Sequence, residues 1–307
     1  MNEGEIIKIE NLTKTKGEKE ILSNISLIVS SGEIFALLGP DGSGKTTLIE
    51  VLLGLQNFDS GNVKIFDKDI RNPKEMREVK KISGMLPQEF STHENLTVVE
   101  NLNYWGNMFD SRMEIDDILD FTNLTDFARR RYRNLPQEKK KLMGLAITLV
   151  NDPQLLLLDE PTSGLDQFSR KEIWSLLKEL KNQGKTIFLS TNNVEEPYVI
   201  ADRVAIIHEG SIKEVGSPVD LVNSFSQDFK VIIRCPNDKE KAAALKALND
   251  KNPLETKTGD IMIISSELML LDILQNLERA EIDYADIITK RPTLNDVYLE
   301  LTGKTLE

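Results

Sequence analysis

The segment with the clearest chemical meaning in this sequence is Gly39–Thr46, which reads Gly-Pro-Asp-Gly-Ser-Gly-Lys-Thr. It fits the pattern G-x-x-x-x-G-K-[ST], in which glycines let the backbone curl until successive N–H groups face one point. A helical run follows at once, and the N-terminus of a helix adds the positive end of its dipole there. The segment therefore predicts a polyphosphate site, in which Lys45 reaches the β- and γ-phosphates and the Thr46 hydroxyl binds Mg²⁺.

A second chemically meaningful segment is Leu155–Glu160, which reads Leu-Leu-Leu-Leu-Asp-Glu. Its apolar run predicts a strand buried on both faces, with two carboxylates at the C-terminal end, where open α/β sheets bind ligands. On this interpretation Asp159 holds the metal ion and Glu160 polarises the attacking water. A strand that ends in two acids is common, so the prediction depends on its pairing with the phosphate loop.

Short apolar strands that alternate with helical patterns must position these two segments. Strands are predicted at 6–9, 34–38, 82–86, 155–158, 186–190 and 204–207. Continuous apolar runs of this kind indicate an α/β fold with a mostly parallel central sheet that is covered by helices. The segment at about 97–150 has helical spacing and predicts a mostly helical insert between two of the strands.

The pattern changes near Ser224, which indicates a second domain. A strand is predicted at 229–233, followed by an Ala/Lys helix, a strand at 261–264, a Leu-rich helix to Leu277, a strand near Ile287 and a terminal helix. This order approximates a βαββαβ unit with one added helix. We therefore expect a large domain at 1–223 and a small α+β domain at 224–307.

Composition restricts the class of protein. Hydrophobic residues make up 40% and charged residues 29% of the chain, as in soluble globular proteins, and no apolar run reaches the roughly 18 residues of a membrane span. The start lacks the regions of a secretory signal, so we expect a cytoplasmic protein. A formal net charge of -12 disfavours broad binding to nucleic acid. The basic stretch at 129–133 and 139–141 is expected to be a solvated helix face, and the single cysteine, Cys235, excludes an intrachain disulfide.

Further motifs make the sequence resemble the ATP-binding cassette (ABC) family over essentially the whole chain. The segment Pro161–Asp166 is similar to the family's D-loop, and Gln88 stands where the family has its Q-loop glutamine. The segment Ala201–Gly210 also follows the family pattern. The tail Arg291–Gly303 resembles the accessory domain that ends many drug- and antibiotic-exporter ATPases.

The resemblance implies a P-loop NTPase cassette that uses ATP and Mg²⁺. It implies an integral membrane permease subunit and a second ABC ATPase subunit, identical or different, as partners, with no nucleic acid. The chain would then lie at the inner face of the cell membrane, held there by the permease. Catalytic roles fall on Glu160 and Lys45. Nucleotide contacts fall on Gly39, Pro40, Asp41, Gly42, Ser43, Gly44, Lys45, Thr46, Thr47, Gln88, Asp159 and Asn192, and metal contacts on Thr46, Gln88 and Asp159.

Three positions depart from the family pattern. In this family each ATP also contacts the partner subunit's signature sequence, usually Leu-Ser-Gly-Gly-Gln, but Leu135–Lys139 reads Leu-Pro-Gln-Glu-Lys. Glu138 then places a carboxylate where the partner's γ-phosphate should arrive, and at an effective dielectric of ~20 two like charges ~4 Å apart repel by about 4 kcal/mol. Asn192 replaces the switch histidine and cannot carry a proton. Lys16 replaces the aromatic residue that stacks on adenine.

The departing signature segment also has the chemistry of an ordinary helix start. Asn134 can be the N-cap, Pro136 fits the first turn, and Glu138 favours the positive end of the helix. Lys139 can compensate by offering its charge to the nucleotide. The histidines, His93 and His208, stand away from the switch position, and we expect surface roles for both.

Three functions are consistent with these residues. The leading hypothesis is a transporter ATPase of the exporter type, which turns over slowly as a homodimer and depends on a partner cassette for faster hydrolysis. The second is a nucleotide-binding regulatory subunit with little or no hydrolysis. The third is a cassette protein that acts on ribosomes or DNA, although such proteins usually carry two cassettes in one chain. The transported substrate belongs to the membrane subunit's pocket and is not encoded here.

Overall fold

The structure, a computed structural model, describes residues 4–225, 229–256, 259–265 and 269–306. The chain divides into two compact units: the first comprises Met1–Pro218 with Leu306–Glu307, and the second comprises Val219–Thr305. The sequence pattern had suggested a division near residue 224. The division falls between Pro218 and Val219, within the first turn of helix α8 (Pro218–Phe225), so the rest of that helix groups with the second unit.

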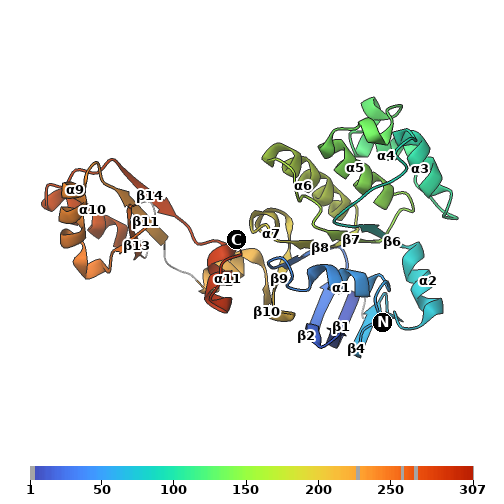
Figure 1. Ribbon diagram of the computed structural model, residues 1–307, viewed down its shortest axis with the longest axis horizontal. Coiled ribbons are helices and arrows are strands. Elements are labelled where there is room, and N and C mark those ends of the chain that lie inside the picture. Colours follow the sequence, from blue (N-terminus) through green and yellow to red (C-terminus); the bar gives the residue numbers. More distant parts are fainter. Residues whose placement is uncertain (1–3, 226–228, 257–258, 266–268, 307) are drawn as a thin grey trace. The chain divides into compact units, whose positions relative to one another are not determined.

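A mostly parallel sheet forms the centre of the first unit, as predicted (Figure 1). Its strand order is β10-β9-β3-β8-β7-β6, and every neighbouring pair is parallel except β10 with β9. The strands are β3 (Ile34–Leu38), β6 (Ser83–Leu86), β7 (Leu155–Asp159), β8 (Thr186–Thr191), β9 (Arg203–His208) and β10 (Ser211–Gly216). Every residue of β3, β7 and β8 is buried, which explains their continuous apolar runs.

A second, antiparallel sheet has the order β2-β1-β4-β5. Its strands are β1 (Glu5–Lys16), β2 (Lys19–Ser30), β4 (Ser60–Ile65) and β5 (Lys68–Asp69). Only residues 6–9 of this sheet were predicted from the sequence. The long strands alternate buried and exposed residues, so their sequence carries polar residues throughout and lacks a continuous apolar run.

Helices cover the sheets and join them. They are α1 (Lys45–Leu52), α2 (Pro73–Lys81), α3 (Val98–Gly106), α4 (Ile115–Phe121), α5 (Gln137–Thr148), α6 (Gln167–Asn182) and α7 (Glu195–Ile200). Helix α1 contacts β2 of the antiparallel sheet and β7 and β8 of the central sheet, and one buried apolar cluster includes residues from all of these elements. Helices α3, α4 and α5 lie in the segment predicted as a helical insert.

The second unit has its own antiparallel sheet, with the order β12-β13-β11-β14. Its elements are α8, β11 (Phe229–Arg234), α9 (Asp238–Ala247), β12 (Leu254–Glu255), β13 (Ile261–Ser265), α10 (Met269–Arg279), β14 (Asp286–Lys290) and α11 (Leu294–Thr302), with a short 3-10 helix at Asn249–Lys251. From β11 onward the elements run in the order expected from the sequence. Within the described residues, no helix combines the length and the apolar character that a membrane crossing requires.

Candidate active site

The loop Gly39–Gly44 connects the end of β3 to the start of α1, and its glycines are required by its geometry. Gly42 and Gly44 have φ values of 76° and 109°, which residues with a side chain rarely adopt. A Cβ atom on Gly44 would lie 2.9 Å from the Ile21 carbonyl oxygen, and one on Gly210 would lie 2.5 Å from the same atom. The β1–β2 hairpin is therefore seated directly against the loop.

Lys45 opens helix α1 and is held inside the loop. Its Nζ atom donates to the carbonyl oxygens of Gly39 at 2.9 Å and Pro40 at 3.0 Å. The same atom lies 3.5 Å from Oε1 of Glu160, and both side chains are at least nine-tenths buried. The basic residue of the loop and the second acid of the Leu155–Glu160 segment thus lie in contact in the folded chain.

Glu160 is fixed from several sides. The Gln88 Nε2 atom donates to Glu160 Oε2 at 3.0 Å, opposite the contact with Lys45. The Glu160 backbone N–H donates to Ser190 Oγ at 3.1 Å, and the Ser190 hydroxyl donates to the Asp159 carboxylate. Glu160 itself has a φ of 46°, a left-handed conformation that is costly for a residue with a side chain and persists only where the surroundings determine it.

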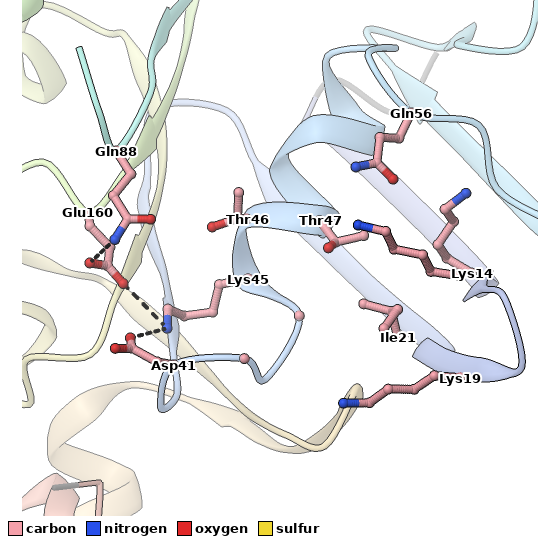
Figure 2. A pocket seen from close by; sticks show the side chains of 13 residues that line it. Lys14, Lys19, Ile21, Asp41, Lys45, Thr46, Thr47, Gln56, Gln88 and Glu160 are labelled. Carbon is pink, nitrogen blue, oxygen red and sulfur yellow. Dashed lines mark hydrogen bonds and ion pairs between the residues drawn. The ribbon is translucent and has the colours of Figure 1, made fainter.

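These groups border a cavity of about 350 Å³, which Figure 2 shows from close by. The predicted residues that line it are Asp41, Gly42, Gly44, Lys45, Thr46, Thr47, Gln88 and Glu160. In Figure 2 Glu160, Gln88 and Asp41 lie at one end, and Lys14, Lys19 and Gln56 lie at the other.

The remaining predicted residues lie behind or beside the cavity. Gly39 and Pro40 supply the carbonyl oxygens that hold Lys45. Ser43 is buried, and its hydroxyl has no hydrogen-bond partner among the described residues. Asp159 is buried at the end of β7. Asn192 is exposed, and its Nδ2 atom donates to Asp41 Oδ1 at 3.3 Å, so it lies beside the phosphate loop.

Sequence reasoning missed Lys14, Lys19, Ile21 and Gln56, which complete the cavity. The first three come from the β1–β2 hairpin, which had not been predicted, and Lys16 of the same hairpin also lines the cavity. No short sequence motif marks these residues, because they come near the phosphate loop only when both sheets pack against α1.

Sequence reasoning also missed Lys141, whose residue run was expected to be a solvated helix face. That expectation is wrong at this position, because Lys141 is buried on the inner face of α5. Its Nζ atom donates to the carbonyl oxygens of Gln88 at 3.1 Å and Glu160 at 3.2 Å. Burial lowers the pKa of Lys141, and the nearby charges of Glu160 and Asp159 partly oppose this shift.

The signature segment forms a helix start, but not with the expected cap. The N-cap of α5 is Pro136, which has no side-chain capping hydrogen bond, while Asn134 ends a short 3-10 helix. Glu138 lies in the first turn, as expected. Lys139 contacts its own chain, because its Nζ atom lies 3.4 Å from Glu172 Oε1 on α6.

Other polar groups near the switch position are buried. Glu196 of α7 is fully buried and accepts hydrogen bonds from Thr162 Oγ1 and Trp174 Nε1, both at 2.8 Å. Burial raises the pKa of Glu196.

The two histidines differ in exposure. His93 is exposed, as expected. The surface role expected for His208 is wrong, because that side chain is buried at the end of β9.

Comparisons with known proteins agree on one family. A family model described as "ABC transporter" matches residues 22–163. The chain is similar to the linearmycin resistance ATP-binding protein LnrL of Bacillus subtilis, with 30% identity over 98% of this chain and 99% of that protein. It is likewise similar to the Nod factor export ATP-binding protein I of Rhizobium etli, with 32% identity over 98% of this chain and 94% of that protein.

A solved structure shares the fold of the first unit. It is the dimeric ATP-binding cassette MJ0796 in a post-hydrolysis state bound to ADP and Pi, with a TM-score of 0.62 and 25% identity. The match covers 69% of this chain and 98% of that one. The α/β cassette with its phosphate loop is therefore a fold with known nucleotide-bound examples.

Proposed function

Because this chain belongs to the ABC transporter family and is an ABC-type ATPase, we propose that it binds and hydrolyses ATP to power a membrane exporter, slowly or in dependence on a partner subunit. The proposal rests on the contacts of Lys45 and Gln88 with Glu160 at one end of the cavity. The Lys45 Nζ atom lies 3.5 Å from Glu160 Oε1, and Gln88 Nε2 donates to Glu160 Oε2 at 3.0 Å. The exporter role is supported by the relatives, which match over nearly their whole length.

Binding of the triphosphate would use the start of α1. The backbone N–H groups of the loop and the dipole of α1 attract the phosphates, and Lys45 exchanges Glu160 for the β- and γ-phosphate oxygens. That exchange frees the Glu160 carboxylate. Glu160 then orients the attacking water and accepts its proton, while Gln88 holds the other carboxylate oxygen.

The residues proposed as metal contacts fit Mg²⁺, which prefers oxygen ligands and is commonly bound by one or two carboxylates plus substrate phosphates. Since Gln88 donates through Nε2, its oxygen is left for another partner, and Figure 2 shows that oxygen and the Thr46 hydroxyl turned toward each other. Asp159 adds the carboxylate. When bound, Mg²⁺ neutralises charge on the phosphates.

We further propose two partners, a permease subunit and a second ATPase subunit, with the chain held at the inner face of the membrane by the permease. In a homodimer the partner's Leu135–Lys139 would face each nucleotide and bring Glu138 toward the γ-phosphate. Asn192 cannot supply the positive charge of a switch histidine. Hydrolysis by the chain alone should therefore be slow.

The first test is the ATPase rate of the purified chain, alone and with its membrane subunit. We expect slow turnover alone, faster turnover in the complex, and a loss of at least about 100-fold in Glu160→Gln, because a positioned general base contributes roughly that much or more. Lys45→Ala should lose nucleotide binding.

Three outcomes would contradict parts of the proposal. Turnover of the chain alone at the rate of the full complex would contradict the slow homodimer. If the chain dimerises when it binds ATP but does not hydrolyse it, even in the complex, the result would support the second hypothesis, a nucleotide-binding regulatory subunit. The altered signature and Asn192 favour that hypothesis. Co-purification with ribosomes or DNA in place of a membrane subunit would select the third class.

A further inference from the structure

We propose that this site takes GTP and other 6-oxopurine nucleoside triphosphates at least as well as ATP, because lysines form the base end of its cavity. The inference rests on the proposed function, since it concerns the same site and asks which base that site accepts. Three observations carry it: the order of groups along the cavity, the lysines of the hairpin, and the hydrogen-bonding character of the purines.

The order of groups along the cavity identifies the base end. Figure 2 shows Glu160 and Gln88 at one end, Thr46 and Thr47 in the middle, and the hairpin residues at the other end. Hydrolysis requires the γ-phosphate beside Glu160, and the start of α1 takes the rest of the triphosphate. The nucleoside must then extend toward the hairpin.

Three lysines of the hairpin line the cavity, namely Lys14, Lys16 and Lys19. Figure 2 shows Lys14 and Lys19 at the base end. Lys16 and Lys19 are directly paired across the two strands, and like charges in this position destabilise a hairpin. Neither of these two lysines, nor Lys14, takes part in the salt bridges found among the described residues. A ligand that offers acceptors would relieve this repulsion.

The chemistry of the lysine side chain then selects among bases. An ammonium group has three donors and no acceptor. Guanine presents two neighbouring acceptors, N7 and O6, whereas adenine presents the N7 acceptor beside the N6 amino donor. The donors of the lysines therefore match guanine and hypoxanthine at both atoms and adenine at only one.

The other residues at this end do not restore a preference for adenine. Among the described residues, none that lines the cavity is aromatic, so no ring stacks on the base. Ile21 provides an apolar side of the cavity for any base. The Gln56 Nε2 atom donates to Glu50 at 2.6 Å, so Gln56 offers one oxygen acceptor at this end, against the donors of three lysines.

The test measures binding by calorimetry to the full chain carrying Glu160→Gln, which stops hydrolysis. The ligands are ATP, GTP, ITP, which has O6 but lacks the amino group of guanine, and tripolyphosphate, which has no base. We expect GTP and ITP to bind at least as tightly as ATP. The triple variant Lys14→Met, Lys16→Met and Lys19→Met should weaken GTP and ITP at least about fivefold more than ATP, the lower bound for loss of a paired base contact. Lys178→Met, an exposed lysine of α6 outside the cavity, should change nothing.

Several results would overturn the inference. Tighter binding of ATP than of GTP in the unaltered hairpin is one. Equal weakening of ATP, GTP and tripolyphosphate binding in the triple variant is another, because it would assign the lysines to the phosphates.

Melting curves of the triple variant verify that it folds. The variant Lys16→Tyr, which supplies an aromatic ring, should shift the preference toward ATP. If no nucleotide binds, or if Lys45→Ala binds as well as the unaltered loop, the proposed function itself fails.

Discussion

At the scale of single residues, the candidate site is a set of charged and polar groups that contact one another, and we propose that a substrate replaces one of these contacts. Lys45 contacts Glu160, Gln88 contacts the other oxygen of the same carboxylate, and Lys141 contacts the backbone of both Gln88 and Glu160. The buried charge of Lys141 is therefore tied to the two residues that we propose position the attacking water. In that proposal Lys141 is a positioning residue rather than a group that touches the substrate.

The burial of Lys141 predicts a pH dependence of stability. Its pKa in the folded chain is lowered below the ordinary 10.5, so the unfolded chain binds more protons between these two values. Stability of the natural chain relative to Lys141→Met should therefore rise with pH through that window and be constant below it. Urea unfolding of both proteins from pH 7 to 10.5 measures this difference, and Lys178→Met serves as the exposed control. A difference that stays flat or falls with pH would contradict the burial of a charged amine.

At the scale of elements, local chemistry explains where some helices begin. The Thr97 side chain accepts from the Glu100 N–H, and the Glu100 carboxylate accepts from the Thr97 N–H, which forms a capping box at the start of α3. The hydrogen bonds from Thr97 hold the pKa of Glu100 below its ordinary value. This box satisfies donors that a helix start would otherwise leave unpaired.

Removal of that cap should destabilise the first unit. We expect Thr97→Ala to lower the free energy of unfolding by about 1 kcal/mol, the usual cost of losing an N-cap hydroxyl. Thr97→Ser keeps a hydroxyl at the same position and should stay within a few tenths of a kcal/mol of the natural chain. Urea unfolding followed by circular dichroism measures both changes. Equal stability of the alanine and serine variants would show that the Thr97 hydroxyl contributes nothing to the cap.

The same contrast between local and distant chemistry explains what could be predicted from the sequence. The phosphate loop and the acidic strand are each one continuous stretch of sequence. Their predicted roles depend on the local backbone of a single strand, loop or helix start. The central sheet was predicted from continuous apolar runs. The β1–β2 hairpin was not predicted, because its strands alternate buried and exposed residues and lack a continuous apolar run. The burial of Lys141 was not predicted either, because the residues beside a lysine in the sequence do not reveal whether it lies on the inner or the outer face of α5. Such residues are placed by tertiary packing alone.

At the scale of the whole molecule, each unit contains an apolar cluster of its own. One cluster lies within the first unit, around both of its sheets, and the other lies within the second unit, around β11 and β13. The nucleotide cavity is lined by the first unit only.

Because each unit contains its own apolar cluster, we expect two thermal unfolding transitions. Bound nucleotide should raise the temperature of only one of them. Scanning calorimetry of Glu160→Gln should resolve both, and ATP at 100 times its Kd should stabilise the first unit by about 2.7 kcal/mol. The transition of the second unit should stay in place. A single transition, or equal shifts of both, would contradict this expectation.

The close approach of Gly44 and Gly210 to the Ile21 carbonyl has a consequence for product release. A Cβ atom on either glycine would collide with that one backbone atom, so Gly44 and Gly210 allow the hairpin to lie directly against the phosphate loop. In the site proposed above, a nucleoside diphosphate would therefore keep its contacts with the hairpin and the loop after bond cleavage, and the change would be confined to the region between Lys45 and Glu160. We expect inorganic phosphate to leave separately from the diphosphate, with Lys45 returning to Glu160 while the diphosphate is still bound.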